Sequence, residues 1–274
     1  MKEIFNPKVS ILIINYNNKK FINKSINSVL GQKYKNYEII FFDDNSDDDS
    51  LEVLKKFKKR NFFLIKNKNT NKKKNKKTFG SYNQINGYLK ALKKSKGEII
   101  FFLDSDDFFH SYKIQKIVNM YNKDLTKKII MDLPYYKYPN QIIEKRNAIR
   151  FFDNYWPQSS PQSCISMRRK FAFQVFKDVN FKKFPNIWLD FRIAVYAKYL
   201  DNLFISKEHL TYYRQSISQV SSGFGFFGFN WWNRRLEAHQ YIIYFFRVKK
   251  ITYRVNFDYL ITKLVNLFYK ILCH

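Results

Sequence analysis

Short apolar runs alternate with amphipathic segments along the first 120 residues of the chain. Runs rich in Ile, Val and Phe occur at 9–14, 37–42, 62–65 and 99–103. Each ends in polar residues, and apolar residues at helical spacing follow near 22–30, 51–57, 85–92 and 114–121. Strands that alternate with helices in this way predict a doubly wound α/β fold built on a mainly parallel sheet.

The pattern is less regular in the second half of the chain. Four prolines follow the apolar run at 129–132: Pro134, Pro139, Pro157 and Pro161. They predict irregular connections around a site, in place of a further regular layer. Apolar spacing resumes later and predicts helices at 189–200 and 231–246.

The last predicted helix, 257–272, is amphipathic. Its apolar face carries Phe257, Leu260, Ile261, Leu264, Phe268, Ile271 and Leu272. Its polar face carries Asp258, Lys263, Asn266 and Lys270. We expect the apolar face to pack on the protein's own core, and a helix lying at a membrane surface is the open alternative.

Composition indicates a folded protein, because 45% of the 274 residues are hydrophobic and 19% are aromatic. We expect a nucleotide-binding half at 1–122, an acceptor-binding half at 123–215 and a basic, aromatic helical extension at 216–274. A Lys- and Asn-rich segment at 66–77 lacks periodicity and predicts a mobile loop.

The net charge of +28 is compatible with nucleic acid, an anionic membrane or acidic substrates. The abundance of Lys, Asn, Ile, Phe and Tyr favours a simpler origin, an A- and T-rich genome.

Cysteine usage and the N-terminal residues bear on the compartment. Cys164 and Cys273 are far apart and form no CxxC pair, so neither a disulfide framework nor a zinc site is indicated. The first seven residues lack the apolar core of a signal peptide, and no run approaches the ~20 apolar residues of a spanning helix. We expect a cytoplasmic protein, with peripheral attachment to the cytoplasmic membrane face as an open alternative.

Three carboxylates, Asp104, Asp106 and Asp107, follow directly after the apolar run at 99–103. Ligands collect at the carboxyl ends of strands in open α/β sheets. Mg²⁺ and Mn²⁺ prefer carboxylate and phosphate oxygens and keep open positions that a diphosphate can fill. The cluster therefore predicts a divalent metal site. The alternative is a solvated acidic turn that caps the following helix.

Gly223–Gly228 matches the GxGxxG pattern of dinucleotide-binding loops literally, but we reject that function for it. No strand precedes the segment and its intervening positions are bulky phenylalanines. We expect an aromatic loop or lid. His110, close to the acidic cluster, is expected to be a surface-turn residue and not a metal ligand.

Four ordered motifs carry a family resemblance: Val-Ser-Ile-Leu-Ile-Ile-Asn-Tyr-Asn at 9–17, Tyr-Glu-Ile-Ile-Phe-Phe-Asp-Asp-Asn-Ser at 37–46, Lys-Gly-Glu-Ile-Ile at 96–100 and Leu-Asp-Ser-Asp-Asp at 103–107. Together they resemble the family-2 glycosyltransferases of the GT-A fold. The match covers roughly the first 110 residues, and weaker similarity at 163–167 and 189–192 extends it to about residue 200.

The resemblance implies a nucleotide-diphosphate sugar as donor, inversion at the anomeric carbon, and Mn²⁺ or Mg²⁺ as cofactor. It also implies an acceptor hydroxyl on a glycan or lipid-linked molecule in surface polysaccharide or glycolipid synthesis. The loop of Asn15, Tyr16 and Asn17 would hold the base, and Asp44 would accept hydrogen bonds from it. Asp104 and Asp106 match the DxD-type motif. Asp106 would lie near ribose or metal, and Asp107 could ligate the metal directly.

An inverting transfer also needs a group that removes the proton of the acceptor hydroxyl. A carboxylate can do so, ideally with a pKa raised by burial from its reference of about 3.9. The resemblance places Asp190 at the family's base position. The alternative for Asp190 is a helix cap or a structural salt bridge, since it lies in a predicted first turn.

Basic residues near the end of the chain are candidates for contacts with phosphate. Guanidinium groups suit phosphate, so Arg214, Arg234 and Arg235 could contact diphosphate or acceptor, and solvated helix charges are the equal alternative. Relatives often carry a histidine after the Tyr-Arg of a late loop. Here Gln215 follows Tyr213-Arg214, which removes support for a late histidine ligand.

Two other functions remain open at this level. A metal-dependent nucleotidyltransferase would use the same acidic cluster, but no Gly-rich triphosphate loop supports it. A basic module that binds nucleic acid or an anionic membrane would account for the charge. No nucleic-acid-binding motif is present, so specific nucleic-acid binding is not expected.

Overall fold

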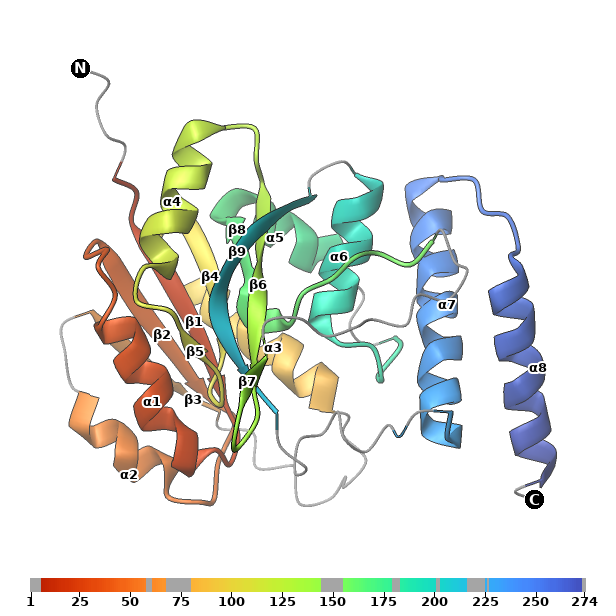
Figure 1. The fold of residues 1–274 in the computed structure, drawn as a ribbon, viewed down its shortest axis with the longest axis horizontal. Helices are drawn as coiled ribbons and strands as arrows, with labels where there is room; N and C mark the ends of the chain where they lie inside the picture. Colours follow the sequence, from red (N-terminus) through yellow and green to blue (C-terminus); the bar gives the residue numbers. More distant parts are fainter. Residues whose placement is uncertain are drawn as a thin grey trace.

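The computed structural model describes residues 6–57, 61–67, 80–143, 155–178, 183–200, 203–215, 225 and 227–272. These residues form a single mixed sheet covered by helices on both faces (Figure 1). The strand order is β3-β2-β1-β4-β8-β6-β9-β5, with β7 paired to β6. The chain is therefore α/β, as its sequence predicts.

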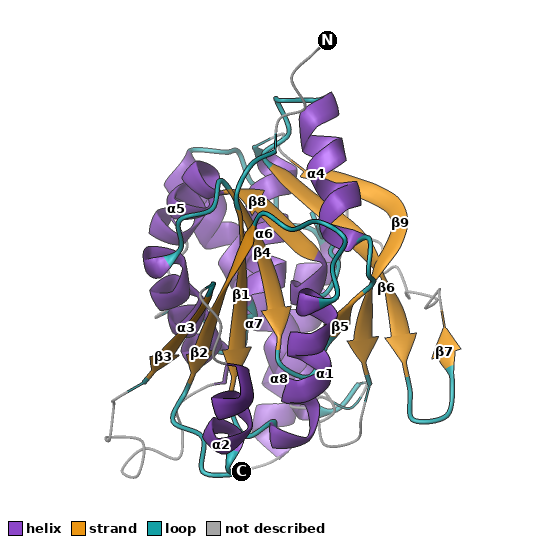
Figure 2. Ribbon diagram, turned by 90° about the vertical axis from the view of Figure 1, so that its left-hand side faces the viewer, coloured by secondary structure: helices purple, strands orange, loops and turns teal. Residues whose placement is uncertain are grey.

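The first half of the sheet consists of the four predicted parallel strands: β1 (Val9–Asn15), β2 (Tyr37–Asp43), β3 (Phe62–Lys66) and β4 (Ile99–Asp104). Strands β1 and β2 are buried along their whole length, as continuous apolar runs require. The arrowheads of these strands point to the same end of the molecule in Figure 2. The polar residues that end each apolar run are thereby brought to one edge.

Two apolar cores lie on opposite faces of the sheet. One core packs the sheet against α1 (Lys19–Leu30), α2 (Ser50–Leu54) with its extension η1 (Lys55–Phe57), and α4 (Lys113–Lys123). The other packs it against α3 (Gly80–Lys94), α5 (Arg169–Asp178), α6 (Leu189–Tyr199) and α7 (Phe229–Lys249). Alternate strand residues supply the two cores, because successive side chains of a strand point to opposite faces.

The expectation of irregular connections in the second half holds at Pro139, Pro157 and Pro161, which lie outside helices and strands, but this half also completes the sheet. It contributes β6 (Ile129–Lys137), β7 (Ile142–Ile143), η3 (Gln162–Cys164), β8 (Ile165–Arg168) and β9 (Leu203–Arg214), and β9 also pairs with β5 (Phe108–Phe109). Pro134 lies inside β6, where the register against β9 shifts. A proline without an N–H is tolerated in a strand at such an irregularity, so it did not end the strand.

Helix α8 (Phe257–Leu272) lies against α7 at the outer edge of the molecule (Figure 1). The expectation that its apolar face packs on the core is wrong: that face is exposed, and the buried residues of the helix are Thr262 and Asn266. Among the described residues, no helix is long and apolar enough to cross a membrane. The segment 68–77, Cys273 and half of the Gly223–Gly228 motif lie outside the described residues.

Candidate active site

The site is built at the carboxyl ends of three neighbouring strands. The register pairs Asn15 at the end of β1 with Asp43 on β2, and Ile14 with Asp104 on β4. Three polar residues that are far apart in the sequence therefore end adjacent strands. This is the position at which ligands bind in open α/β sheets.

Two of the predicted base-binding residues hold the loops after β1 and β2 together. The Asn15 amide donates to Asp43 Oδ2 at 2.8 Å and to Ser46 Oγ at 3.1 Å. Asn17 adopts a left-handed backbone conformation, with φ of 52°, which asparagine tolerates better than most residues. Its amide donates to Asp47 Oδ1 at 2.7 Å, and its Oδ1 accepts from the backbone N–H of Asp47 at 2.9 Å.

Tyr16 lies between these two asparagines, with 52% of its surface exposed. Asp44 is almost fully buried, and its Oδ1 accepts a 2.7 Å hydrogen bond from the Asn67 amide. Asn67 Oδ1 in turn accepts from Lys90 Nζ at 3.1 Å. Hydrogen bonds between side chains of different elements thus hold the loops after β1 and β2 in place.

Two side chains of helix α3 donate hydrogen bonds to Asp104. Its Oδ1 accepts hydrogen bonds from Gln84 Nε2 at 2.9 Å and from the Tyr88 hydroxyl at 2.7 Å. Burial, together with the charges of Asp106 and Asp190, raises the pKa of Asp104 to about 7. The helix can approach closely because Gly87 faces the sheet, where a Cβ atom would lie 2.8 Å from the Phe42 ring.

Asp107 is buried and is fixed on both carboxylate oxygens. Its Oδ2 accepts a 2.5 Å hydrogen bond from Ser163 Oγ, and its Oδ1 accepts from the backbone N–H of Arg214 at 2.8 Å. The Arg214 Nε donates to the carbonyl oxygen of Asp106 at 2.8 Å. Burial, together with the nearby charges of Asp106 and Asp104, raises the pKa of Asp107 well above its usual value. Three predicted site residues, Asp106, Asp107 and Arg214, are therefore neighbours.

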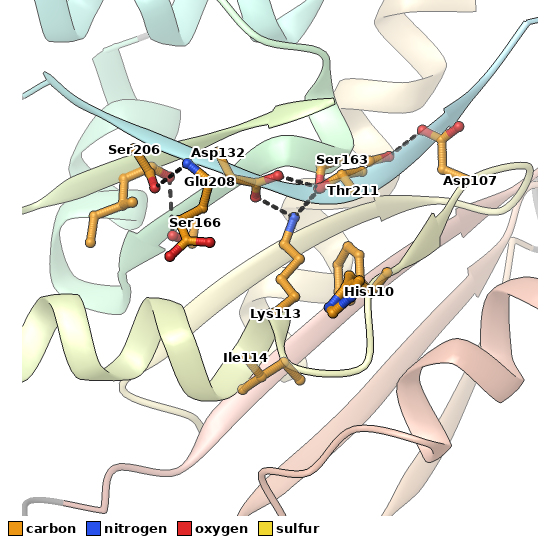
Figure 3. Close-up of polar contacts among 12 residues, drawn as sticks. Asp107, His110, Lys113, Ile114, Asp132, Ser163, Ser166, Ser206, Glu208 and Thr211 are labelled. Carbon is orange, nitrogen blue, oxygen red and sulfur yellow. Dashed lines mark hydrogen bonds and ion pairs between the residues drawn. The ribbon is translucent and has the colours of Figure 1, made fainter. Parts of the chain in front are cut away.

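A buried polar network that includes Lys113, Asp132 and Ser163 supports Asp107 (Figure 3). Lys113 of α4 is completely buried; its Nζ lies 2.6 Å from Asp132 Oδ2 and donates to the carbonyl oxygen of Ser163 at 2.7 Å. Lys113 Nζ also donates to Thr211 Oγ1 at 2.5 Å. Ser163 connects this network to the site, because its Oγ bonds Asp107 and also accepts from the backbone N–H of Asp104 at 3.0 Å.

Asp190 lies opposite the acidic cluster, in the first turn of α6. Burial raises its pKa, while Arg234 of α7 and the backbone N–H of Phe191, 2.7 Å from Asp190 Oδ1, lower it. Tyr213 lies close enough to Asp190 and to the acidic cluster for their charges to affect its pKa. Its pKa is raised well above the usual value by burial and then by Asp107, Asp190, Asp104 and Asp106. The structure thus brings the predicted base and the predicted metal-binding carboxylates around one tyrosine.

Arg235, another arginine predicted to contact diphosphate or acceptor, lies against α8. Its guanidinium pairs with Asp258 of α8 and lies 4.7 Å from the Trp156 ring centroid. Its neighbour Arg234 is the arginine of α7 that interacts with Asp190. Burial lowers the pKa of Arg234, and the charge of Asp190 raises it. His110 lies in the turn before α4, where its Nδ1 accepts from the backbone N–H of Tyr112 at 3.3 Å.

The acidic residues suit a divalent cation in donor type but do not form a complete cage. Across the described part of the chain, no three His, Cys, Asp or Glu side chains are arranged as a metal site. Mg²⁺ and Mn²⁺ are often bound through one or two carboxylates, with substrate phosphates and water as the other ligands. Asp106 and Asp107 fit that mode, since an opposite charge relieves the mutual repulsion that raises the pKa of Asp107.

Comparison with known proteins identifies the class. The model of the family described as glycosyl transferase family 2 matches residues 10–187. The chain therefore belongs to glycosyl transferase family 2.

Individual relatives share part of the chain or its fold. A UDP-Glc:alpha-D-GlcNAc-diphosphoundecaprenol beta-1,3-glucosyltransferase of Escherichia coli, WfaP, is 37% identical over 137 residues, which cover 50% of this chain and 47% of that protein. This chain thus spans about half the length of that curated relative. Staphylococcus aureus TarS 1–349 in complex with UDP-GlcNAc superposes with a TM-score of 0.59 at 14% identity, covering 94% of this chain and 70% of TarS 1–349.

A third similar protein is the mannosyltransferase PcManGT of Pyrobaculum calidifontis, solved in complex with GDP-Man and Mn²⁺. It superposes with a TM-score of 0.56 at 13% identity and covers 94% of this chain and 69% of that one. At such identities these structures establish the fold alone, a GT-A type of mixed α/β sheet. The fold expected from the sequence is confirmed.

Four site residues were not identified as such from the sequence: Gln84, Tyr88, Ser163 and Tyr213. Gln84 and Tyr88 are four residues apart on α3, a spacing that puts both on the face directed at Asp104. That spacing would identify both residues as site residues once α3 is known to lie beside the end of β4. Ser163 reaches Asp104 from η3, and Tyr213 lies on β9, which pairs with β6; no local pattern encodes these tertiary contacts.

Proposed function

We propose that this protein is an inverting glycosyltransferase that moves a sugar from a nucleotide-diphosphate sugar to an acceptor hydroxyl, assisted by Mn²⁺ or Mg²⁺. One observation carries the proposal: a carboxylate with a raised pKa, Asp190, faces the acidic cluster at the ends of the parallel strands. The two parts match the two needs of the reaction, a base for the acceptor and a charged site for the departing diphosphate. Membership of glycosyl transferase family 2 supports the same activity.

The donor nucleotide would lie along the ends of β1, β2 and β4. In this arrangement the exposed ring of Tyr16 stacks on the base and Asp44 accepts a hydrogen bond from it. Asp104 and Asp106 lie toward the ribose and the diphosphate. Asp106 and Asp107 would hold the cation, which neutralises the charge that develops on the leaving diphosphate. Arg214, placed beside both residues, offers a further positive charge to the phosphates.

The acceptor would enter between Asp190 and the donor sugar. Asp190 removes the proton of the acceptor hydroxyl as that oxygen attacks the anomeric carbon. Burial raises the pKa of Asp190 and so favours proton uptake, while Arg234 opposes that rise and favours the ionised form that acts as the base. An acceptor on a lipid diphosphate, as named for the WfaP relative, is one candidate within the proposed class. The phosphate of such an acceptor would be compatible with Arg234.

A thermal-shift panel of UDP, GDP, dTDP and CMP sugars, each with and without Mn²⁺, tests the donor site. A ligand that binds the folded state must raise its apparent stability, by about 2.7 kcal/mol at a hundred times its Kd. We expect one nucleotide to stabilise the protein, with a larger shift when Mn²⁺ is present. No response from any donor, in either condition, would contradict the proposal.

The Asp190→Asn variant tests the base. We expect it to keep the donor-induced thermal shift and to lose transfer by about two to four orders of magnitude, the usual contribution of a general base. Asp178→Asn, in the neighbouring helix α5, is the matched control, because that carboxylate pairs with Lys249 and Tyr196 away from the site. Undiminished transfer in Asp190→Asn would rule Asp190 out as the base.

A further inference from the structure

Helix α8 has its polar and apolar faces arranged opposite to those of a helix that packs on a protein core. Thr262 and Asn266 are buried against α7. The apolar residues point away from the protein: Phe257, Leu260, Ile261, Leu264, Leu267, Phe268, Ile271 and Leu272 are all exposed. Leu264 has 65% and Phe268 has 68% of its surface exposed. Their spacing of three and four residues makes them one continuous stripe along the helix.

Specific polar contacts on the inner side hold the helix in this orientation. Asn266 Nδ2 donates to the carbonyl oxygen of Trp232 on α7 at 2.9 Å. Asp258 pairs with Arg235, lies 3.1 Å from His239 Nε2 and accepts from Trp156 Nε1 at 2.9 Å. These partners hold the pKa of Asp258 well below its usual range. Turning the helix to bury its apolar stripe would remove each of these contacts.

The apolar stripe therefore requires a partner outside the described residues, since folded proteins seldom leave such a continuous apolar surface in water. The charge around it distinguishes between partners. Lys263 and Lys270 are exposed along one edge of the stripe, and exposed Arg254 precedes the helix. The whole chain carries a net charge of +28. Two copies of so basic a chain repel one another, whereas an anionic surface attracts it.

We propose that α8 binds the surface of a bilayer that contains anionic lipid. The helix lies in the plane of the interface, with its apolar stripe among the acyl chains and its lysines among the headgroups. It does not cross the bilayer, because no helix of the described residues meets that requirement. Membrane binding of this kind needs no donor or acceptor, so it stands apart from the proposed transferase activity.

The placement of α8 has a consequence for the site. Figures 1 and 2 show the C-terminal end of α8 at the same end of the molecule as the carboxyl ends of the parallel strands. Helix α7, which supplies Arg234 to the site, also supplies the contacts that anchor α8. A protein bound through α8 therefore holds α7, which carries Arg234, next to the lipid-bound helix.

The test is co-sedimentation of the full chain with vesicles of phosphatidylcholine, with and without phosphatidylglycerol. We expect binding that requires phosphatidylglycerol and weakens as salt is raised. The double variant Leu264→Asp, Phe268→Asp should lower the partition coefficient by at least about a hundredfold, since two large apolar side chains no longer enter the bilayer. Leu125→Asp is the matched control, because Leu125 is similarly exposed, at 69%, but lies outside α8. It should bind like the wild type.

A second variant, Lys263→Glu with Lys270→Glu, keeps the stripe and reverses its charged edge. It should bind phosphatidylglycerol vesicles at least about tenfold more weakly. Far-UV circular dichroism and the melting temperature check that each variant is folded. Equal binding by wild type and the Leu264→Asp, Phe268→Asp variant would overturn the proposal. Absence of vesicle binding would also overturn it, whether the chain sediments as a dimer or as a monomer. Donor-induced thermal shifts, measured in parallel, report separately on the proposed transferase.

Discussion

Replacing Asp104 by asparagine is expected to stabilise the protein at alkaline pH. Asp104 has a pKa of about 7 in the folded protein, raised first by burial and then by Asp106 and Asp190. The unfolded value is near 3.9. Because the folded carboxyl holds its proton more tightly than the unfolded one, folding is favoured while that proton is bound. This contribution is complete below about pH 3.9 and is lost as the pH rises through about 7.

The size of the effect follows from the pKa difference. One pKa unit corresponds to about 1.36 kcal/mol, so a difference of about 3 units corresponds to about 4 kcal/mol of unfolding free energy lost between acid and alkaline pH. About 3 kcal/mol of that change falls between roughly pH 5 and pH 8.5. Asparagine keeps an oxygen that can accept from Gln84 and Tyr88, and it carries no charge at any pH. The variant should therefore lack this part of the pH dependence.

Urea unfolding of wild type and Asp104→Asn at about pH 5 and about pH 8.5, with a chelator present, measures the difference. We expect the variant to gain about 2 to 3 kcal/mol on the wild type between the two pH values. Asp124→Asn is the control. Hydrogen bonds from Lys127 and Thr126 lower the pKa of Asp124 to about 2, so its contribution is present above about pH 3.9 and is lost only at more acid pH. An Asp104→Asn variant whose advantage does not grow with pH would refute the reasoning.

Two further predictions concern the network behind Asp107. Ser163→Ala removes the hydroxyl that bonds Asp107 and the Asp104 N–H. This variant should weaken Mn²⁺ binding by about 10- to 100-fold in a titration with UDP present. The control variant Ser95→Ala, directly after α3, should have no effect. Lys113→Met leaves Asp132 buried without its counter-ion and should cost about 3 to 5 kcal/mol in urea unfolding. Adding Asp132→Leu should recover most of that loss, and a double variant as unstable as the single one would contradict the assigned pairing.

The parallel half of the fold could be predicted from the sequence because its signals are local. Each buried strand is a continuous apolar run that ends in polar residues, and each helix repeats apolar residues at helical spacing. In the second half the helices α6, α7 and α8 were predicted but the strands were not, because the prolines after the run at 129–132 were taken as signs of irregular connections. In the structure Pro134 lies at a register shift between β6 and β9, a feature of strand pairing that no single segment encodes.

The site residues that directly follow predicted strands could also be predicted from the sequence. Asp104, Asp106, Asp107, Asp44 and Asn15 follow predicted strands, and the structure places them at one edge of the sheet. Arg234 and Arg235 were both candidates from the sequence, and the structure puts Arg234 on the side of Asp190 and pairs Arg235 with Asp258. The orientation of α8 depends on the partners of Asp258, which come from α7 and from the segment that carries Trp156. Helical periodicity gives the two faces of that helix but not which one is buried.

The measurement that tests the central claim most directly is the identity of the product released from a nucleotide-sugar donor. The protein, Mn²⁺ and the donor that stabilises it are incubated with a lipid-linked or glycan acceptor, and nucleoside diphosphate and pyrophosphate are both quantified. We expect acceptor-dependent release of nucleoside diphosphate by the wild type, lost in Asp190→Asn. Release of pyrophosphate would indicate a nucleotidyltransferase, and nucleoside diphosphate release that is unchanged in Asp190→Asn would contradict the proposed arrangement of base and acidic cluster.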